Sequence, residues 1–234
     1  VSVEALAERF GVTLQTVRRD VQRLAEAGLV ARFHGGVRVP SSTTENIAYR
    51  QRQAMQADGK SRIARAIAAR IPPGCSLILN LGTTTEEVAR ALQQHKNLHV
   101  VTNNLNVAAI LQHKEDFTVI IAGGQVRSRD GGIIGEATID FINQFKVDYG
   151  IIGISGIDED GSLLEFDYQE VRVAQAIIAN SRRVYLAADY SKFHRNPVVR
   201  QGNLSQLDAL FTDRRPPESI TRLLTQHDVA LHIA

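Results

Sequence analysis

The chain has 234 residues, of which 44% are hydrophobic, and its 27 lysines and arginines against 25 aspartates and glutamates leave a net charge of +2. This length fits one large domain plus a small one, and the apolar share suffices for a packed core. The sequence holds neither a run of about eighteen apolar residues nor a charged-then-apolar leader. We therefore expect neither a membrane-spanning nor an exported protein.

Cysteine and histidine usage excludes further classes. Cys75 is the only cysteine, which rules out an internal disulfide framework and fits a protein of the reducing cytoplasm. It stands at the start of an apolar strand pattern, so we expect a buried thiol rather than a nucleophile. The seven histidines form no H-x-H or H-E-x-x-H pattern, and we expect no zinc site and no cofactor.

Residues 1–28 predict two short helices joined by a tight turn. In "SVEALAERFG", Ser2 is the expected N-cap and Gly11 the expected end. Helical spacing predicts that three apolar side chains face inward: Val3, Leu6 and Phe10. The second helix runs from its cap Thr13 to Gly28, which completes a helix-turn-helix pattern. Because the chain opens with valine inside a helix pattern, we expect that a preceding segment is missing.

On the second helix, Val17, Val21 and Leu24 form an apolar stripe, and polar residues lie on the opposite face. In "LVARFHGGVRV", two β-rich arms flank Gly35-Gly36, a pair suited to a hairpin turn. Residues 1–39 therefore predict a small winged helix-turn-helix domain. Arginine and glutamine can each make two hydrogen bonds to a base in the major groove, and free amides at the helix start favour a phosphate. We predict that DNA contacts Thr13, Gln15, Thr16, Arg18, Arg19, Gln22, Arg23, Arg32, His34 and Arg38. The alternative is a solvated basic helix in a small helical cap.

The pattern of apolar residues changes after residue 39. Residues 40–59, which open with "PSSTTEN", are predicted to be a linker. Residues 60–234 begin with the basic helical stretch "KSRIARAIAARI". Short, continuously apolar runs then alternate with helical patterns, as in "CSLILNL", "FTVIIA" and "RVYLAA". Continuous apolarity indicates burial on both faces, so we predict a larger α/β domain with a mostly parallel sheet between helices.

The turns that follow these strands predict a site for a phosphate. In "LILNLGTTTEEVARAL", a strand passes through Gly82 into three threonines at the start of a helix, which offers backbone amides and hydroxyls to an anion. Ligands of open α/β sheets bind beyond the carboxyl ends of the strands. Other strand-end turns, "TNN", "AGG", "SGID" and "DYSKF", add polar groups. The predicted site for a small phosphorylated metabolite comprises Gly82, Thr83, Thr84, Thr85, Asn103, Gly123, Gly124, Asp158 and Lys192.

Two other interpretations stay open at this point. In the first, Thr83 and Thr84, which each begin a T-x-x-E pattern, cap the helix and do not bind a phosphate. The segment "VRSRDGGIIGE", with Arg127, Arg129 and Asp130, would form either a lid or a subunit contact.

A catalytic alternative rests on carboxylates. Asp158, Glu165 and Asp167, together with Lys192, could move protons on a sugar phosphate, as an aldose–ketose isomerase must. Structural roles compete with this interpretation, because Asp167 also begins a D-x-x-E capping pattern and Asp158 lies in the turn "DEDGS".

The assembled segments resemble the DeoR family of bacterial transcriptional repressors. "SVEALAERFGVTLQTVRRDVQRLAEAGLVARFHGG" resembles its DNA-binding signature. "NLGTT", "VTNNLNVA", "AGG", "SGID" and "SKF" resemble its sensor domain, whose fold is similar to that of ribose-5-phosphate isomerase. Within the family, "RSRDGGIIGEATIDFINQF" and "GISGIDEDGSLLEFDYQEVR" are most similar to repressors of glycerol catabolism.

The resemblance implies a repressor that sn-glycerol 3-phosphate, or a related phosphorylated polyol or sugar, releases from operator DNA. It also implies a homodimer or homotetramer, and a signal path through the linker and the helix at 60–71. Two departures stand out. Asn80 replaces an aspartate that is common in the family, and an amide cannot act as a carboxylate base. The family's first helix, ahead of the helix-turn-helix, is absent from this sequence.

Overall fold

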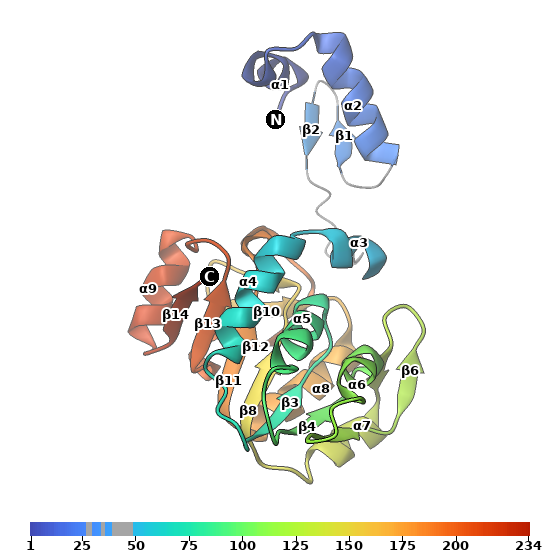
Figure 1. Ribbon diagram of the computed structural model, residues 1–234. Coiled ribbons are helices and arrows are strands. Elements are labelled where there is room, and N and C mark those ends of the chain that lie inside the picture. Colours follow the sequence, from blue (N-terminus) through green and yellow to red (C-terminus); the bar gives the residue numbers. More distant parts are fainter. Residues whose placement is uncertain (27–29, 34–35, 39–48) are drawn as a thin grey trace. The chain divides into compact units, whose positions relative to one another are not determined.

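The structure is a computed structural model that describes residues 1–26, 30–33, 36–38 and 49–234. It divides into two compact units, Val1–Ser42 and Thr43–Ala234, which we call the small unit and the large unit (Figure 1). Among the described residues, no helix combines the length and the apolar character that crossing a bilayer requires.

Two helices and a two-stranded antiparallel sheet make up the small unit: α1 (Val3–Phe10), α2 (Leu14–Glu26), β1 (Ala31–Phe33) and β2 (Gly36–Arg38). The Ser2 hydroxyl accepts a hydrogen bond from the Ala5 amide at 3.1 Å, and Gly11 ends α1 in the left-handed region. The Thr13 hydroxyl accepts one from the amide of Thr16 at 3.2 Å. The capping residues of the sequence therefore define these helix ends.

The core of the small unit is formed by valines from both helices and the wing: Val3, Val17, Val21 and Val37. The expectation that Phe10 and Leu24 also face inward was wrong, since they are 66% and 41% exposed. Phe10 is the last residue of α1 and Leu24 lies in the final turn of α2, so both extend past this core. Residues 34–35 of the expected hairpin turn lie outside the described residues.

A seven-stranded parallel sheet forms the centre of the large unit. The three apolar runs quoted above and four more, "LHVV", "YGIIGIS", "DALFT" and "VALHI", supply one strand each: β3 (Ser76–Leu79), β4 (His99–Thr102), β5 (Thr118–Ile121), β8 (Val147–Ile152), β11 (Ser181–Ala187), β13 (Ala209–Thr212) and β14 (Ala230–Ile233). Their spatial order is β14-β13-β11-β8-β3-β4-β5. The parallel sheet predicted from continuous apolarity is thus confirmed.

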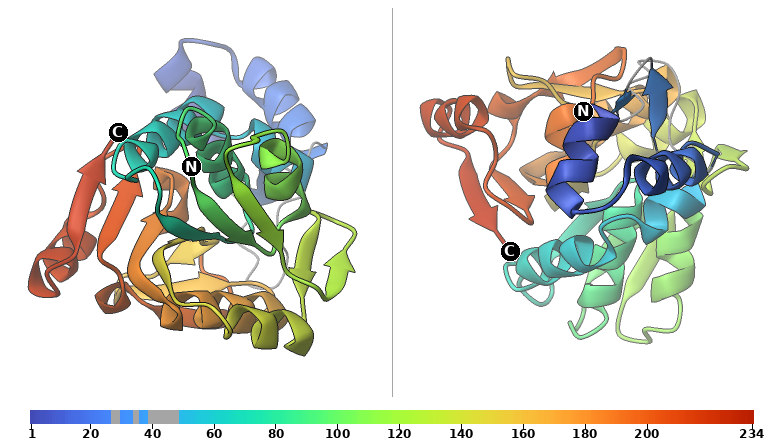
Figure 2. Two further views of the ribbon diagram at one scale, coloured as in Figure 1. Left: turned by 60° about the horizontal axis from the view of Figure 1, so that its bottom comes forward. Right: turned by 90° about the horizontal axis from the view of Figure 1, so that it is seen from above.

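Helices cover both faces of this sheet (Figure 2). One face packs against α4 (Ala57–Ala68), α5 (Thr83–Leu92) and α6 (Leu105–Leu111). The other packs against α7 (Glu136–Ile142), α8 (Tyr168–Ala179) and α9 (Glu218–Gln226). The two apolar layers explain why the strands show no alternation of apolar and polar residues.

Several short elements were not foreseen. They are the hairpin of β6 (Gln125–Arg127) and β7 (Gly132–Ile134), an antiparallel sheet of β9 (Gly156–Ile157), β10 (Ser162–Glu165) and β12 (Val199–Asn203), and the 3-10 helices η1 (Tyr190–His194) and η2 (Leu204–Gln206). Residues 49–59, placed in the predicted linker, are largely helical. They form α3 (Tyr49–Ala54) and the first turn of α4.

Candidate functional site

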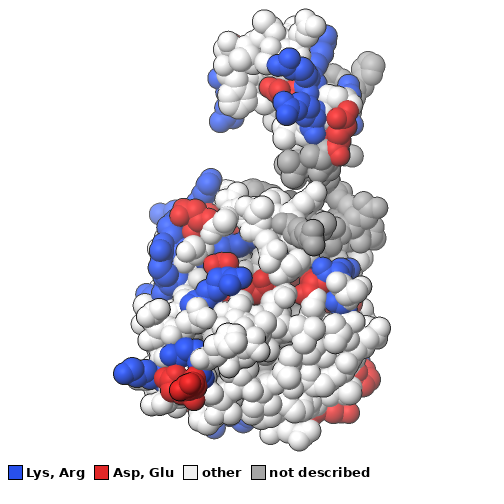
Figure 3. All heavy atoms as spheres, turned by 45° about the vertical axis from the view of Figure 1, so that its right-hand side comes forward, with Lys and Arg blue, Asp and Glu red and all other residues white. Residues whose placement is uncertain are grey.

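The exposed face of α2 carries the residues predicted to contact DNA. Five of them are exposed side chains: Gln15, Arg18, Arg19, Gln22 and Arg23. Thr16 is partly covered, and Thr13 caps the helix. Arg32 of the wing donates a hydrogen bond to Gln22, whose amide nitrogen donates to Glu26 at 2.6 Å. Helix and wing therefore contribute to one polar surface, and Figure 3 shows arginines gathered on the small unit.

Two of the predicted DNA contacts have no described side chain. His34 lies outside the described residues, and Arg38 is described only as part of β2.

The sheet of the large unit places the Gly82 loop at its point of reversal. From β3 the chain winds outward to β4 and β5, and it then returns to β8 on the other side of β3 before it continues to β11, β13 and β14. Ligands of doubly wound sheets bind at the carboxyl ends of the two strands where the winding reverses. Here those strands are β3 and β8, and Gly82–Thr85 follows β3 after Asn80 and Leu81.

The start of α5 has the features of an anion site. Gly82 precedes the helix with φ 135°, a backbone that favours glycine, and no side chain caps this end among the described residues. The Thr85 hydroxyl donates to the Gly82 carbonyl at 2.7 Å. The first-turn amides of a helix have no partner within the helix. The capping alternative for Thr83 and Thr84 was therefore wrong, and these buried residues leave amides available.

Glu86 bonds to other elements instead of capping α5. This buried carboxylate accepts hydrogen bonds from the Tyr49 hydroxyl at 2.7 and 2.9 Å and from the Asn106 amide at 3.1 Å. Burial, followed by the hydrogen bond and charge of Glu86, raises the pKa of Tyr49 well above its usual range. The contact fixes α3 to the helix that carries the Gly82 loop.

Four cations lie near one another beside these strand ends. Lys60 of α4 is buried, and burial together with the charge of Lys192 lowers its pKa to about 8, while Arg52 lowers it and Glu87 of α5 raises it. Burial also lowers the pKa of Lys192, as do the charges of Arg195 and Arg52. The Asp189 carboxylate, 3.9 Å from the Lys192 ammonium, offsets only part of this charge. An arrangement that suppresses protonation of two lysines favours an added anion.

Two buried amide oxygens at the ends of neighbouring strands add acceptors. The side-chain oxygens of Asn80, after β3, and Asn103, after β4, have no hydrogen-bond partner among the described residues. The Asn103 amide nitrogen donates to the Ile133 carbonyl at 3.3 Å. Unpaired buried acceptors are costly unless a ligand or water satisfies them, and the hydroxyls of a polyol phosphate would do so.

The remaining predicted site residues have structural contacts of their own. The Thr138 hydroxyl donates to the Gly123 carbonyl at 2.9 Å, and a Cβ at Gly124 would lie 2.2 Å from the same hydroxyl oxygen. Gly124 thus lets the chain pack tightly beside α7, whereas a Cβ at Gly123 would meet no atom within 4 Å. The Asp158 amide and carbonyl close the turn between β9 and β10. Neither observation requires a ligand.

Carboxylates considered for proton transfer are largely engaged elsewhere. Asp167 caps α8 through the amides of Gln169 and Glu170. It also accepts from Arg127 and Arg129, each at 2.9 Å. The structural alternative for Asp167 is therefore confirmed. Glu165 is buried, and its pKa is raised by burial and then by the nearby Glu170.

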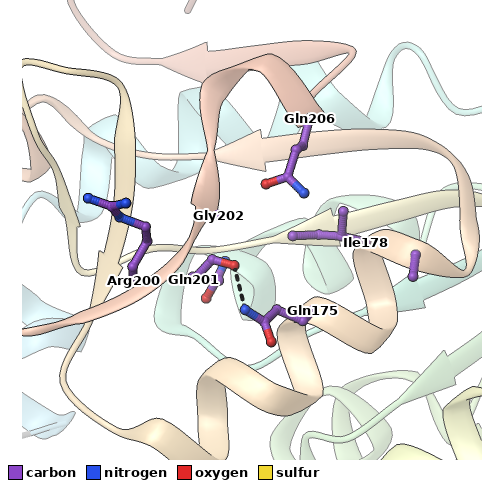
Figure 4. Close-up of a pocket in the computed structure, with 7 residues that line it drawn as sticks. Gln175, Ile178, Arg200, Gln201, Gly202 and Gln206 are labelled. Atoms are coloured by element: carbon purple, nitrogen blue, oxygen red, sulfur yellow. Dashed lines mark hydrogen bonds between the residues drawn. The ribbon is translucent and has the colours of Figure 1, made fainter.

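A separate hollow of about 350 Å³ lies between α8 and β12 (Figure 4). Its lining consists of Gln175, Ile178, Ala179, Arg200, Gln201, Gly202 and Gln206. The Gln175 amide donates to the Gln201 carbonyl at 3.1 Å, which joins its two walls. The hollow shares no residue with the predicted site.

Sequence reasoning missed Tyr49, Arg52, Lys60 and Glu86. One signal was available for Lys60, because it precedes Ile63, Ala64 and Ile67 at helical spacing and so occupies an apolar stripe. Glu86 was interpreted as a capping residue. The roles of Tyr49 and Arg52 depend on contacts with distant elements, for which the local sequence gives no signal.

Comparisons with known proteins fit this arrangement. The profile of the DeoR-like helix-turn-helix domain matches residues 1–43, and that of the DeoR C terminal sensor domain matches residues 55–214. The chain is 56% identical to the glycerol-3-phosphate regulon repressor of Escherichia coli K12, covering all of this chain and 92% of that protein. It is 49% identical to the protein of the same name from Haemophilus influenzae, covering 99% and 89%. Against the transcriptional repressor CsqR of E. coli K12 the identity is 40%, covering 99% and 88%.

Solved structures align with part of this chain. The delta subunit of eIF2B from Chaetomium thermophilum aligns with a TM-score of 0.52 at 15% identity, over 68% of this chain and 57% of that one. Ribose 5-phosphate isomerase A from Methanocaldococcus jannaschii aligns with a TM-score of 0.44 at 13% identity, over 59% and 55%.

Proposed function

We propose, from the premise that this chain belongs to the DeoR family of transcriptional regulators, that it represses genes of glycerol 3-phosphate metabolism. In this proposal α2 and the wing bind operator DNA, and sn-glycerol 3-phosphate at the strand-end site releases it. The name of the E. coli and H. influenzae relatives supports the regulon, and the family supports a phosphorylated effector. The protein would act as a homodimer or homotetramer.

One observation carries the effector half of the proposal. The uncapped start of α5 follows β3, where the sheet reverses its winding, and buried cations lie near the same helix. The phosphate would accept hydrogen bonds from the amides of Thr83–Thr85 and pair with Lys60 and Lys192. The two hydroxyls of glycerol 3-phosphate would donate to Asn80 and Asn103.

Release from DNA requires a difference in affinity. The effector shifts the protein toward the arrangement that does not bind the operator only if it binds that arrangement more tightly. α3 joins the linker to α5 through Tyr49 and Glu86. α5 would therefore contact the effector through its first residues. One turn later, its Glu86 contacts Tyr49 of α3, the helix that follows the linker.

The direct test is a titration of protein bound to a DNA fragment from upstream of its glycerol catabolism genes. We expect sn-glycerol 3-phosphate to release the DNA at lower concentration than fructose 1-phosphate, fructose 6-phosphate or glycerol. Release by a fructose phosphate alone would contradict the proposed effector, and failure to bind any such fragment would contradict the proposed regulon.

The isomerase alternative is not favoured, because the relatives are named as repressors. Asn80 and the capping role of Asp167 agree with this. Incubation with ribose 5-phosphate should give no ribulose 5-phosphate, and turnover would revive the alternative.

A further inference from the structure

Arg52 lies on α3, the short helix that follows the linker and packs against α5 (Figure 1). It falls between the two ranges that match the family profiles, residues 1–43 and 55–214. Its side chain is 17% exposed, and its Nε atom is buried without a hydrogen-bond partner among the described residues. A buried donor of this kind costs free energy unless another group, such as a ligand, accepts its hydrogen bond.

Asp130, the ion-pair partner of Arg52, is held mainly by another arginine. Its carboxylate lies 3.6 Å from an Arg52 Nη atom, which is too long for a hydrogen bond. The same carboxylate accepts hydrogen bonds from Arg127 at 2.7 and 2.9 Å, and the Nε of Arg129 lies 3.8 Å away. Asp130 is therefore shared among three arginines, and Arg52 keeps positive charge that an added anion could pair with.

Arg52 belongs to the group of cations beside the strand ends. The Lys60 ammonium donates a hydrogen bond to the Arg52 carbonyl, which joins α4 to α3. Burial is the main cause that lowers the pKa values of three other cations, Lys60, Lys192 and Arg195. The positive charge of Arg52 lowers each of these pKa values further. Because the effect of a charge weakens with distance, Arg52 lies close to all three side chains.

Acidic side chains offset the charge of these cations only in part. The Asp189 carboxylate lies 3.9 Å from the Lys192 ammonium. Burial, and then the charge of Glu170, raise the pKa of Glu165 to about 8, so this carboxyl group is largely protonated at neutral pH. Positive charge thus remains for a phosphate group. Arginine suits such a group because its Nε–H and Nη–H donors match two phosphate oxygens.

We propose that Arg52 binds the phosphate group of the effector directly through its unpartnered Nε, so that α3 completes the effector site. This role rests on the proposed function and adds a contact to the same site. Tyr49 fixes α3 to Glu86 without any ligand. Arg52 would make the position of α3 depend on the effector, because the phosphate draws its guanidinium away from Asp130. The effector would then act on the helix that follows the linker without an intermediate element.

Calorimetric titration of the full chain tests this contact with two probes, sn-glycerol 3-phosphate and inorganic phosphate. Arg52→Met removes the guanidinium and should weaken the binding of both probes by about tenfold or more. Arg52→Lys keeps the charge but lacks the Nε–H, and should weaken binding by about threefold or more. Arg65→Met removes an exposed charge from α4 and should change neither affinity. Unchanged affinity in Arg52→Met, or full affinity in Arg52→Lys, would overturn the inference.

A further variant separates phosphate binding from a purely structural role. Asp130→Asn removes the carboxylate beside Arg52 and leaves the guanidinium in place, so affinity for inorganic phosphate should be retained or increased. A loss as large as that in Arg52→Met would mean that Arg52 only holds α3 through Asp130, and would overturn the inference. Circular dichroism checks that every variant folds.

The two probes also separate this inference from the proposed function. A parent chain that binds inorganic phosphate but not sn-glycerol 3-phosphate would contradict the proposed effector alone, because the Arg52 variants still test the contact with inorganic phosphate. A parent chain that binds neither probe would overturn both.

Discussion

The charge of Lys60 makes the proposed effector site at the start of α5 sensitive to pH. Its pKa of about 8 arises from burial and from Lys192, whereas an unfolded lysine keeps a value near 10.5. A bound phosphate dianion favours the charged lysine and should raise this pKa again. We therefore expect effector binding near pH 8 to take up protons, and affinity to fall as pH rises from 7 to 9.

Calorimetry in two buffers with different ionisation enthalpies measures this uptake. Lys60→Met should weaken binding and reduce the buffer dependence, leaving only the contribution of Lys192, whose pKa burial also lowers. A binding enthalpy that is the same in both buffers at pH 8 would show that Lys60 does not sense the effector.

The same pKa predicts a stability effect in the free protein. Because the folded pKa is lowered, the unfolded chain binds more protons between pH 8 and 10.5, so the free energy of unfolding contributed by Lys60 rises with pH through that window. Below pH 8 the charged lysine destabilises the fold. Lys60→Met should therefore raise the melting temperature at pH 7 and lose this advantage toward pH 10.5. An advantage that is constant with pH would contradict the assignment.

Arg127 is predicted to be a strong contributor to the stability of the large unit. Its side chain is 11% exposed, and its guanidinium nitrogens lie 2.7 to 2.9 Å from carboxylate oxygens of Asp130, Asp167 and Glu170. Arg127→Met would leave these carboxylates without their shared cation and should cost about 3–5 kcal/mol in urea unfolding. Arg182→Met, at an exposed ion pair of 3.8 Å, should cost less than about 1 kcal/mol. Equal costs would contradict the importance of this network.

At the scale of elements, α2 should govern DNA affinity alone. Arg19→Ala should weaken operator binding by about 1–3 kcal/mol if Arg19 contacts a base, and leave effector affinity unchanged. Arg222→Ala, on the exposed side of α9, is the matched control and should alter neither. Loss of both affinities in Arg19→Ala would contradict the separation of DNA and effector binding.

The length and burial of an element decide whether it can be predicted from the sequence. All seven apolar runs became strands of the parallel sheet, and those in its interior, such as β3 and β8, are largely buried because helices cover both faces. The strands β6, β7 and β9 have two or three residues, too few for any period. The α3 segment, "YRQRQA", has no apolar stripe, and its helix is held by the hydrogen bond from Tyr49 to Glu86 and the ion pair from Arg52 to Asp130 at 3.6 Å.

The sequence indicates those features of the proposed effector site that depend on local pattern. Gly82 and the threonines indicate the start of a helix. Because they follow an apolar strand, the sequence also indicates that this loop lies at the carboxyl ends of the strands. The order of the strands, which puts β8 beside β3, cannot be read from local pattern, and neither can the partners of Lys60 and Glu86. Gly124 and Asp158 have contacts in packing and in a turn that need no ligand, so their effector-binding role, like that of Gly123, stays a prediction.

At the scale of the whole molecule, coupling should depend on α3. Tyr49→Phe removes the hydroxyl that donates to Glu86, 37 positions further along the chain. We expect operator affinity without effector and effector affinity without operator to change little, while the factor by which saturating effector weakens operator binding falls. Fluorescence anisotropy of labelled operator, with and without glycerol 3-phosphate, measures that factor.

Tyr168→Phe serves as the control for this experiment, because Tyr168 is 61% exposed at the start of α8. The same loss of coupling in both variants, or none in Tyr49→Phe, would mean that the signal takes another route.

The pairing of β3 with β8 has a consequence for biosynthesis. Leu77 of β3 aligns with Tyr149 of β8, so the middle of the sheet cannot close until that later strand has left the ribosome. The small unit needs only contacts among residues within Val1–Ser42, which are short-range and form quickly. During synthesis the small unit would therefore fold before the sheet that carries the proposed effector site is complete. A partly synthesised chain could then bind DNA without responding to the metabolite, so the response depends on completing translation.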